Sequence, residues 1–274
     1  MDKHNQAQES HYEQQYSHSK VELSYEESSD LWEWAKWFPL LELEGFLKTI
    51  RGRRLVAICC GSGRELGLFH KYGIKTTATD LTINHLETLI EDRIIESAEI
   101  QNAERLSYKE DDYDYGFVNA GLHHLAHPHA GLNELMRVGR EAAIFIESQD
   151  SILHSLGKMM GRNADFEPAG NYVYRWSRRE VEKIALSSHA YSYAIRTNFL
   201  PVLVRMRGVT GEKKRKWQRR LNVLDGFLGW AGNLMVVIIF KRKPNDEQIK
   251  YFKDNNYYYK DLTEKYPAHI KLRT

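Results

Sequence analysis

The sequence has few of the features that mark exported, membrane-spanning or nucleic-acid-binding chains. Only two of its 274 residues are cysteines, and these are the neighbours Cys59 and Cys60. Adjacent cysteines rarely bridge each other because the geometry is strained, so a disulfide scaffold is excluded and a reducing, cytoplasmic compartment is expected. The formal net charge is only +2, so no overall field demands a nucleic-acid partner.

Long hydrophobic runs are also missing. The first twenty residues are polar, which excludes a secretory signal there. The most apolar stretch, 221–240, contains Asp225 and is divided by Gly229 and Gly232, so we expect no transmembrane span. The composition is otherwise that of a globular protein, with 42% hydrophobic and 28% charged residues, in a chain long enough for one large domain.

Short apolar runs alternate with helical patterns through the middle of the chain. Strand-like runs occur at 54–60, 74–79, 98–103, 115–120 and 142–147, and again at 191–199 and 235–241. Helical spacing separates the first five of them, at 63–72, at 83–95 and after Pro128. This alternation predicts an α/β fold with a Rossmann-like, seven-stranded, mostly parallel sheet and helices on both faces.

The flanking segments differ from this core. Residues 1–50 are expected to form a helical cap over the active site of the domain 51–243, and 244–274 a polar, tyrosine-rich tail. A basic helical insert, 205–232, precedes the last strand. The insert could be a solvated helix face, a patch for a phosphate-bearing acceptor, or a membrane-surface contact, because apolar residues follow its charges. No RNA-binding module is visible, so no nucleic-acid partner is expected.

The first strand runs into Gly61-Ser62-Gly63, and a helix follows at once. Small residues there let the backbone approach a ligand, and a helix N-terminus offers unpaired N–H groups. Asp80 ends the second strand about 20 residues later, where a carboxylate can accept hydrogen bonds from ribose hydroxyls. Taken alone, this pattern fits a nicotinamide dinucleotide equally well, although Leu66 replaces the third glycine of that fingerprint.

Five segments in order resemble the class I S-adenosylmethionine-dependent methyltransferases: VAICCGSGRELG, ATDLT, QNAERL, YGFVNAGLHHLAHPHAGLNELMRVGR and AAIFIE. The resemblance spans residues 55–147 and is closest to the small-molecule type with a His-His-Leu stretch after the fourth strand. It implies S-adenosylmethionine as the cofactor. It also implies methylation of O or N on a small-molecule acceptor, such as a sugar or a secondary metabolite.

The resemblance further implies a set of cofactor-binding residues. In it, Asp80 holds the ribose, Leu81 packs on the adenine, and Tyr12 or Tyr16 covers the site. The full set is Tyr16, Gly61, Ser62, Gly63, Asp80, Leu81, Asn102, Ala103, Asn119 and Ala120. The chain departs from the family at Ala57, where an acidic residue is usual, and at Cys59, where glycine is usual.

A histidine cluster follows the fourth strand and is the richest source of bases. An imidazole titrates near neutral pH, so His123 or His124 could take a proton from a hydroxyl or ammonium acceptor. The alternative is that they pack or cap backbone. His123 and His127 have the spacing of helical metal ligands, but Pro128 suggests that the helix starts later, and no carboxylate or cysteine lies within the cluster. No metal is therefore expected.

Two other functions compete with methyl transfer. A nicotinamide-dependent oxidoreductase would need a tyrosine three or four residues before a lysine beside the site, and none is well placed. A non-catalytic module that only binds S-adenosylmethionine is suggested by the altered positions Ala57 and Cys59. Aromatic residues after the fifth strand, Tyr172, Tyr174 and Trp176, together with Arg175, are candidates for the acceptor pocket.

Overall fold

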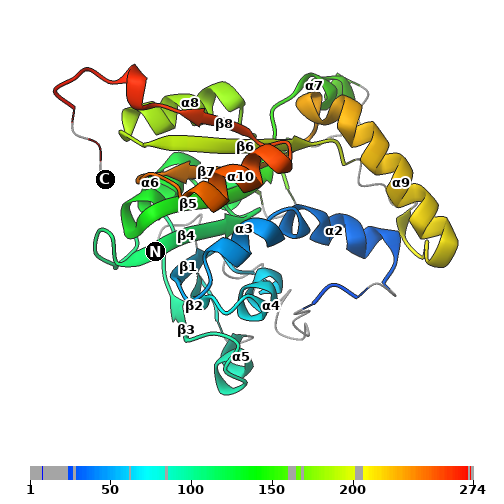
Figure 1. Cartoon of the computed structure of the whole chain (residues 1–274). Coiled ribbons are helices and arrows are strands. Elements are labelled where there is room, and N and C mark those ends of the chain that lie inside the picture. The colour runs from blue at the N-terminus through cyan, green and yellow to red at the C-terminus, as the bar shows by residue number, and fades with distance from the viewer. Residues whose placement is uncertain are drawn as a thin grey trace.

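The computed structural model describes residues 8, 24–26, 29–61, 63–83, 86–159, 165–167, 170–200, 206–270 and 272. Within them the strands form one sheet in the order β3-β2-β1-β4-β5-β7-β6-β8, with helices on both faces (Figure 1). The predicted α/β, mostly parallel architecture is confirmed.

Five parallel strands make up the first part of the sheet: β1 Arg54–Ile58, β2 Lys75–Asp80, β3 Ser97–Ile100, β4 Tyr113–Asn119 and β5 Gly139–Ser148. β7 (Leu234–Phe240) lies antiparallel between β5 and β6 (Ser192–Asn198). An eighth strand, β8 (Tyr258–Asp261), pairs antiparallel with β6 and extends the seven that the sequence predicts.

The helices begin and end at local signals in the sequence. Their bounds are α2 Leu31–Leu41, α3 Glu44–Thr49, α4 Arg64–Lys71, α5 Glu87–Glu91, α6 Pro128–Val138, α7 Ile152–Met159, α8 Arg178–Ser187, α9 Gly211–Leu228 and α10 Asp246–Asp254. Ser177 and Glu180 form the capping box at the start of α8. Gly73, at φ +66°, follows α4. α5 ends at Glu91, before the end of the helical pattern at 83–95, and Arg93 turns the chain there at φ +58°.

The central strands β1, β4, β5 and β7 bury both of their faces, as their near-continuous apolar runs require. Leu55 and Ala57 of β1 belong to the apolar cluster that includes residues of α3, α4 and α10. Val56 and Ile58, which alternate with them, belong to the cluster that includes residues of α6 and α8. The sheet is therefore held between two helical layers, and the ends of its strands are left for a site.

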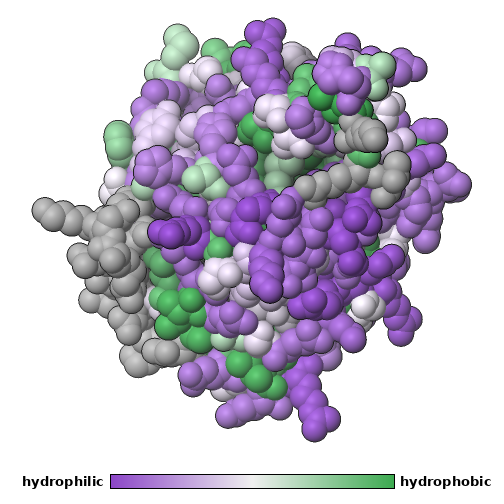
Figure 2. All heavy atoms as spheres, turned by 90° about the vertical axis from the view of Figure 1, so that its left-hand side faces the viewer, coloured by the Kyte–Doolittle hydropathy of each residue, from purple (hydrophilic) through white to green (hydrophobic). Residues whose placement is uncertain are grey.

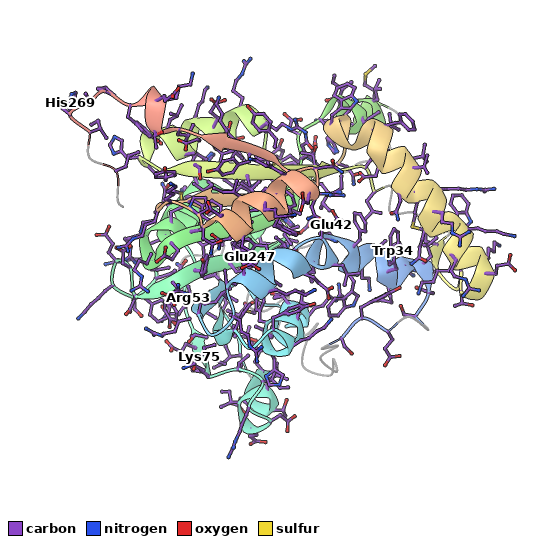
Figure 3. The ribbon with its side chains drawn as sticks, in the orientation of Figure 1. Trp34, Glu42, Arg53, Lys75, Glu247 and His269 are labelled. Atoms are coloured by element: carbon purple, nitrogen blue, oxygen red, sulfur yellow. The ribbon has the colours of Figure 1, made fainter. Side chains whose placement is uncertain are left out.

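The segment expected to be a polar tail contributes to the core. Phe252 of α10 is fully buried, with its ring centre 5.8 Å from that of Phe46 of α3 and 6.0 Å from that of Tyr259 of β8. The Tyr251 hydroxyl donates to the carbonyl of Glu42, which lies close to α10 (Figure 3). A side chain at Gly45 would overlap the ring of Tyr251, so glycine is needed for this close packing.

α9 packs on α2 at one side of the molecule (Figure 1). Trp34 of α2 lies between the two helices (Figure 3), in an apolar cluster that includes Leu31 and Leu221. Arg196 of β6 forms ion pairs with Glu42 and Asp225 and so ties both helices to the sheet. None of the helices in the described part of the chain has the length and hydrophobicity that a membrane span requires.

We expect Phe252→Ala to lower the free energy of unfolding by about 3–5 kcal/mol, because it leaves a cavity between α3 and β8. The change should be measured by urea denaturation. The neighbouring Lys253 is exposed, so Lys253→Ala serves as the matched control and should change stability by less than about 0.5 kcal/mol. Equal effects of the two substitutions would mean that the C-terminal segment is not docked in solution.

Candidate functional site

The turn between β1 and α4 has an unusual backbone. Cys59, Gly61 and Gly63 all have positive φ, at +52°, +46° and +67°. The left-handed region costs a non-glycine residue about 1–2 kcal/mol, which explains why glycine is usual at the position of Cys59. Gly121, on the loop after β4, lies against Cys59, and a Cβ there would come within 2.5 Å of the Cys59 Cβ. Ser62 lies outside the described residues.

Asp80, at the carboxyl end of β2, is positioned by this turn. Its Oδ2 accepts a hydrogen bond from the backbone N–H of Gly61 at 2.7 Å, and its Oδ1 accepts one from that of Leu81 at 2.7 Å. Charge-assisted bonds of this kind hold the carboxylate in one orientation. The predicted ribose-binding group therefore lies directly beside the glycine turn.

A cavity opens at the carboxyl ends of β1, β2 and β4, the edge at which parallel α/β sheets bind ligands. Among the residues predicted from sequence, it is lined by Gly61, Asp80, Leu81, Asn102, Ala103, Asn119, Ala120 and His124. Gly63 and His123 are not in its lining, and Tyr12 and Tyr16 lie outside the described residues. Lining residues that the sequence analysis missed are Gln8, Cys59, Cys60, Arg64, Gln101 and Leu125.

Arg64 and Gln8 connect the cavity to the N-terminal part of the chain. The guanidinium of Arg64 lies 5.6 Å from the ring centre of Trp37 and 3.8 Å from the Glu33 carboxylate, both on α2. Gln8 is buried, and its Nε2 lies 3.4 Å from Oδ1 of Asn171. Both contacts join segments far apart in sequence, so no local pattern could have indicated them.

A buried acid near the cavity was also missed. Glu65, in the first turn of α4, is only 3% exposed, and burial raises its pKa to about 7 against the opposing effects of its own backbone N–H, Arg64 and the side chain of Asn119. Ala57, where the family usually has an acidic residue, is fully buried on β1. Glu65 thus brings a carboxyl group to the side chain of Asn119 from α4, whereas the acidic residue that is usual in the family would lie on β1, at the position of Ala57.

The two histidines after β4 form a short 3₁₀ helix, η2 (Leu122–His124). Nδ1 of His123 lies 2.7 Å from Oε2 of Glu147, which is almost fully buried on β5. The other oxygen of Glu147 accepts the backbone N–H of Leu122 at 2.7 Å. One carboxylate therefore fixes both the backbone and a side chain of η2.

Glu167 binds the other side of this pair. Its Oε1 lies 3.5 Å from Nε2 of His123, and its Oε2 lies 3.0 Å from Nδ1 of His124. Asn171 supports the arrangement through Nδ2, which donates to Oε2 of Glu167 at 3.3 Å and to the carbonyl of His123 at 3.0 Å. Glu167 is far from the histidines in sequence, and no motif identified it.

The carboxylates control the charge of His123. Burial alone would lower the pKa of this imidazole, but Glu147 and Glu167 outweigh that effect and raise the pKa to about 10. His123 and His124 in turn hold the pKa of Glu167 well below its usual range. At neutral pH His123 is therefore an imidazolium between two carboxylates.

His123, His124 and Glu167 could also hold a metal ion, since one ligand atom from each lies within 4.8 Å of the others. In the sequence, His123 and His127 have the spacing of metal ligands and no carboxylate lies within the cluster. The structure corrects that grouping, because His127 pairs with Glu104 at 3.1 Å, whereas the fold brings Glu147 and Glu167 to His123. The prediction that no metal is bound stays a prediction.

The aromatic residues proposed for an acceptor pocket have other contacts. Trp176 is fully buried and packs on Phe145 at 5.4 Å between ring centres. Tyr174 donates its hydroxyl to Glu180. Neither of them lines the cavity, so core packing accounts for both.

Comparisons with known proteins bear on the family and the fold. A family model described as "Methyltransferase domain" matches residues 56–146, which run from β1 to β5. YcgJ from Bacillus subtilis has 15% sequence identity and a TM-score of 0.51, covering 75% of this chain and 100% of that chain. A chain of the Haloferax volcanii complex between the Trm112 methyltransferase activator and a methyltransferase has 15% identity and a TM-score of 0.54, covering 77% and 92%. No curated protein matches.

The structural likenesses show the fold, and the family match covers the segments that form the site. The matched residues include the β1–α4 turn, Asp80 and η2. The order of the first seven strands is typical of the same family. Residues 56–146 therefore form a class I S-adenosylmethionine-dependent methyltransferase domain.

Proposed function

We propose that this domain methylates an oxygen or nitrogen atom of a small-molecule acceptor, with His124 as the base that takes the acceptor's proton. The observation that carries the proposal is the composition of the cavity, whose lining includes both Asp80 and His124. A carboxylate suited to a ribose and an imidazole suited to proton transfer thus face one space. A sugar or a secondary metabolite is the acceptor class we favour by family resemblance.

The residues around the cavity fit S-adenosylmethionine. When bound, the cofactor supplies a methyl group on a sulfonium, which leaves behind a neutral thioether. Asp80 offers carboxylate oxygens for ribose hydroxyls, and Leu81 offers an apolar surface for the adenine. Asn102 can accept from an adenine amino group through its side-chain oxygen. Asn119 and Ala120, at the end of β4, would lie beneath the sulfonium.

The charges of the two histidines separate their roles. His123 holds its proton at neutral pH and has carboxylates on both ring nitrogens, so it serves as a positioning residue. His124 lines the cavity, and its Nδ1 faces Glu167 at 3.0 Å. An imidazole oriented by a carboxylate on one nitrogen can accept a proton on the other. We therefore assign the base role to His124.

The chain's other contribution is orientation. Methyl transfer requires the acceptor atom in line with the breaking bond, and placement of this kind can supply several kcal/mol of the barrier reduction. Arg64 and Gln8 line the cavity and are fixed by Trp37 and Asn171, respectively. These contacts would close the cavity wall around the acceptor and limit the access of water.

The rival functions are less well supported. An oxidoreductase would not explain the match of residues 56–146 to a methyltransferase domain. A module that binds the cofactor without turnover would explain the match, and it would leave the His124–Glu167 pair without a use. Turnover on an acceptor decides between them.

We expect Asp80→Ala to weaken binding of S-adenosylhomocysteine by about 1–3 kcal/mol, because hydrogen bonds to a charged group are lost. Isothermal titration calorimetry measures this directly. Glu91→Ala, which removes an exposed acid on α5, is the matched control and should bind like the wild type. Unchanged affinity in Asp80→Ala would contradict the ribose assignment.

His124→Ala should lower the rate of methyl transfer about a hundredfold or more while sparing cofactor affinity, since only proton removal is affected. Glu167→Gln should lower the rate in the same direction. His129 is outside the cavity and pairs with Glu180, so His129→Ala is the control. The assay follows methyl transfer to a panel of hydroxyl and amine acceptors, with and without a chelator. Loss of methyl transfer on addition of the chelator would mean that a bound metal ion, and not His124 as a base, activates the acceptor.

The raised pKa of His123 makes stability depend on pH. Its folded pKa of about 10 lies above the ordinary value of 6.5, so the stabilisation is fully present below pH 6.5 and is lost as the pH rises toward 10. We expect the wild-type free energy of unfolding to fall faster between pH 7 and 9 than that of His123→Gln. The extra slope is at most about 1.4 kcal/mol per pH unit. If urea denaturation gives the same dependence of unfolding free energy on pH for the wild type and His123→Gln, His123 is not charged in the folded protein between pH 7 and 9.

A further inference from the structure

Exposed apolar side chains gather on two helical segments that the proposed chemistry does not use. They are Ile152, Leu156 and Met159 of α7, Val223, Leu224 and Phe227 of α9, and Trp230 of η4 (Gly229–Ala231), with exposed fractions from 41% to 84%. Single exposed apolar residues are ordinary on a protein surface, but a group of this size marks an interaction site. We call these seven residues the apolar patch.

Strand pairing brings the two segments to the same edge of the sheet. Ser148 of β5 is the register partner of Leu234 of β7, and the backbone N–H of Gln149 donates to the carbonyl of Asn233 at 2.9 Å. α7 begins soon after this pair, and η4 ends just before it. The apolar patch therefore emerges at the carboxyl end of β5, the same sheet edge at which the cavity opens.

The exposed face of α9 combines apolar and cationic side chains. With 100° between successive residues, Trp217, Val223, Leu224 and Phe227 fall within an arc of about 120°. Leu221 falls outside this arc, about 100° from its centre, and is buried in the cluster with α2. The contact of α9 with α2 therefore does not use the exposed apolar arc.

Cations precede the apolar patch residues along α9. Arg207, Lys213, Arg215, Lys216, Arg219 and Arg220 are all exposed on this helix or just before it. Glu212 is the exposed acid of α9, and it pairs with Lys216 at 3.0 Å. The other acid, Asp225, is turned inward to Asn198, at 3.1 Å. The surface is therefore strongly positive next to the apolar patch.

The face on the other side of the molecule offers a contrast. The face shown in Figure 2, at the other side of the molecule from α9, is largely hydrophilic with scattered apolar residues. Exposed apolar groups and clustered cations thus coincide on α9. A second copy of this chain would bring like charges together, whereas a bilayer with anionic headgroups takes up both kinds of side chain.

We propose that α7, α9 and η4 form a docking surface for a bilayer that contains anionic lipids. The apolar patch would enter the boundary between headgroups and acyl chains, and the cations of α9 would lie at the level of the headgroups. Docking there would place the mouth of the cavity beside the membrane surface. The proposal does not depend on which acceptor is methylated or on the role of His124.

The test is co-sedimentation of the full chain with vesicles of phosphatidylcholine alone or mixed with phosphatidylglycerol. We expect binding to the anionic vesicles to be at least about tenfold tighter and to weaken with added salt. The double variant Phe227→Ser/Trp230→Ser and the double variant Lys216→Gln/Arg220→Gln should each bind at least about tenfold more weakly. Both should keep the wild-type affinity for S-adenosylhomocysteine, which separates this proposal from the function of the cavity.

The matched control variants remove the same kinds of side chain, apolar and cationic, from surfaces outside the proposed docking surface. Ile100→Ser takes away an apolar side chain that is 66% exposed on β3, and Lys250→Gln/Lys253→Gln removes two cations from α10. These variants should sediment with anionic vesicles as the wild type does. Equal binding to both vesicle types, no binding to either, or full binding by the patch variants would overturn the proposal. A dimer of this chain, or a complex with RNA, would also overturn the proposal if the Phe227→Ser/Trp230→Ser variant no longer forms it and anionic vesicles do not displace it.

Discussion

The buried carboxylate of Glu147 is the contact on which the site depends. It lies near the end of β5, is 1% exposed, and engages both the Leu122 N–H and Nδ1 of His123. A buried charge is tolerated only when it is paired and hydrogen-bonded. The contacts with η2 therefore stabilise the buried carboxylate, and the carboxylate in turn fixes the position of η2. The loop after β4 is thereby locked to the neighbouring strand, and His124, the next residue, is held at the cavity.

A second constraint connects the loops after β1 and β4. Cys59 takes the left-handed conformation that glycine usually provides, and Gly121 gives the space that its side chain occupies. The departure at one motif is therefore accommodated by a small residue in another. Glu65 likewise brings a carboxyl group near Asn119 while Ala57 leaves β1 without one. In both places a residue on a neighbouring segment stands beside the altered position.

Local patterns predicted the parts of the site that are local. Gly61, Asp80 and Asn119 follow directly from strand ends, because parallel strands end at one edge of the sheet. Glu167 and Gln8 could not be predicted, since each reaches the site from a segment without a motif. The C-terminal helix and strand were missed for another reason: Phe252 and Tyr259 contact the core through only a few aromatic rings in a polar context. α10 did carry a local signal, the capping box of Asn245 and Gln248 at its start. For β8, tertiary packing decides, and not periodicity.

The two neighbouring cysteines have a consequence for a protein that handles an electrophile. Both cysteines are among the residues that line the cavity, and burial, together with the nearby carboxylates of Asp80 and Glu65, raises the pKa of their thiols well above the ordinary value. Thiolates, and not thiols, are the reactive sulfur nucleophiles. When S-adenosylmethionine is bound in this cavity, thiols held in the protonated form would not compete with the acceptor for its methyl group.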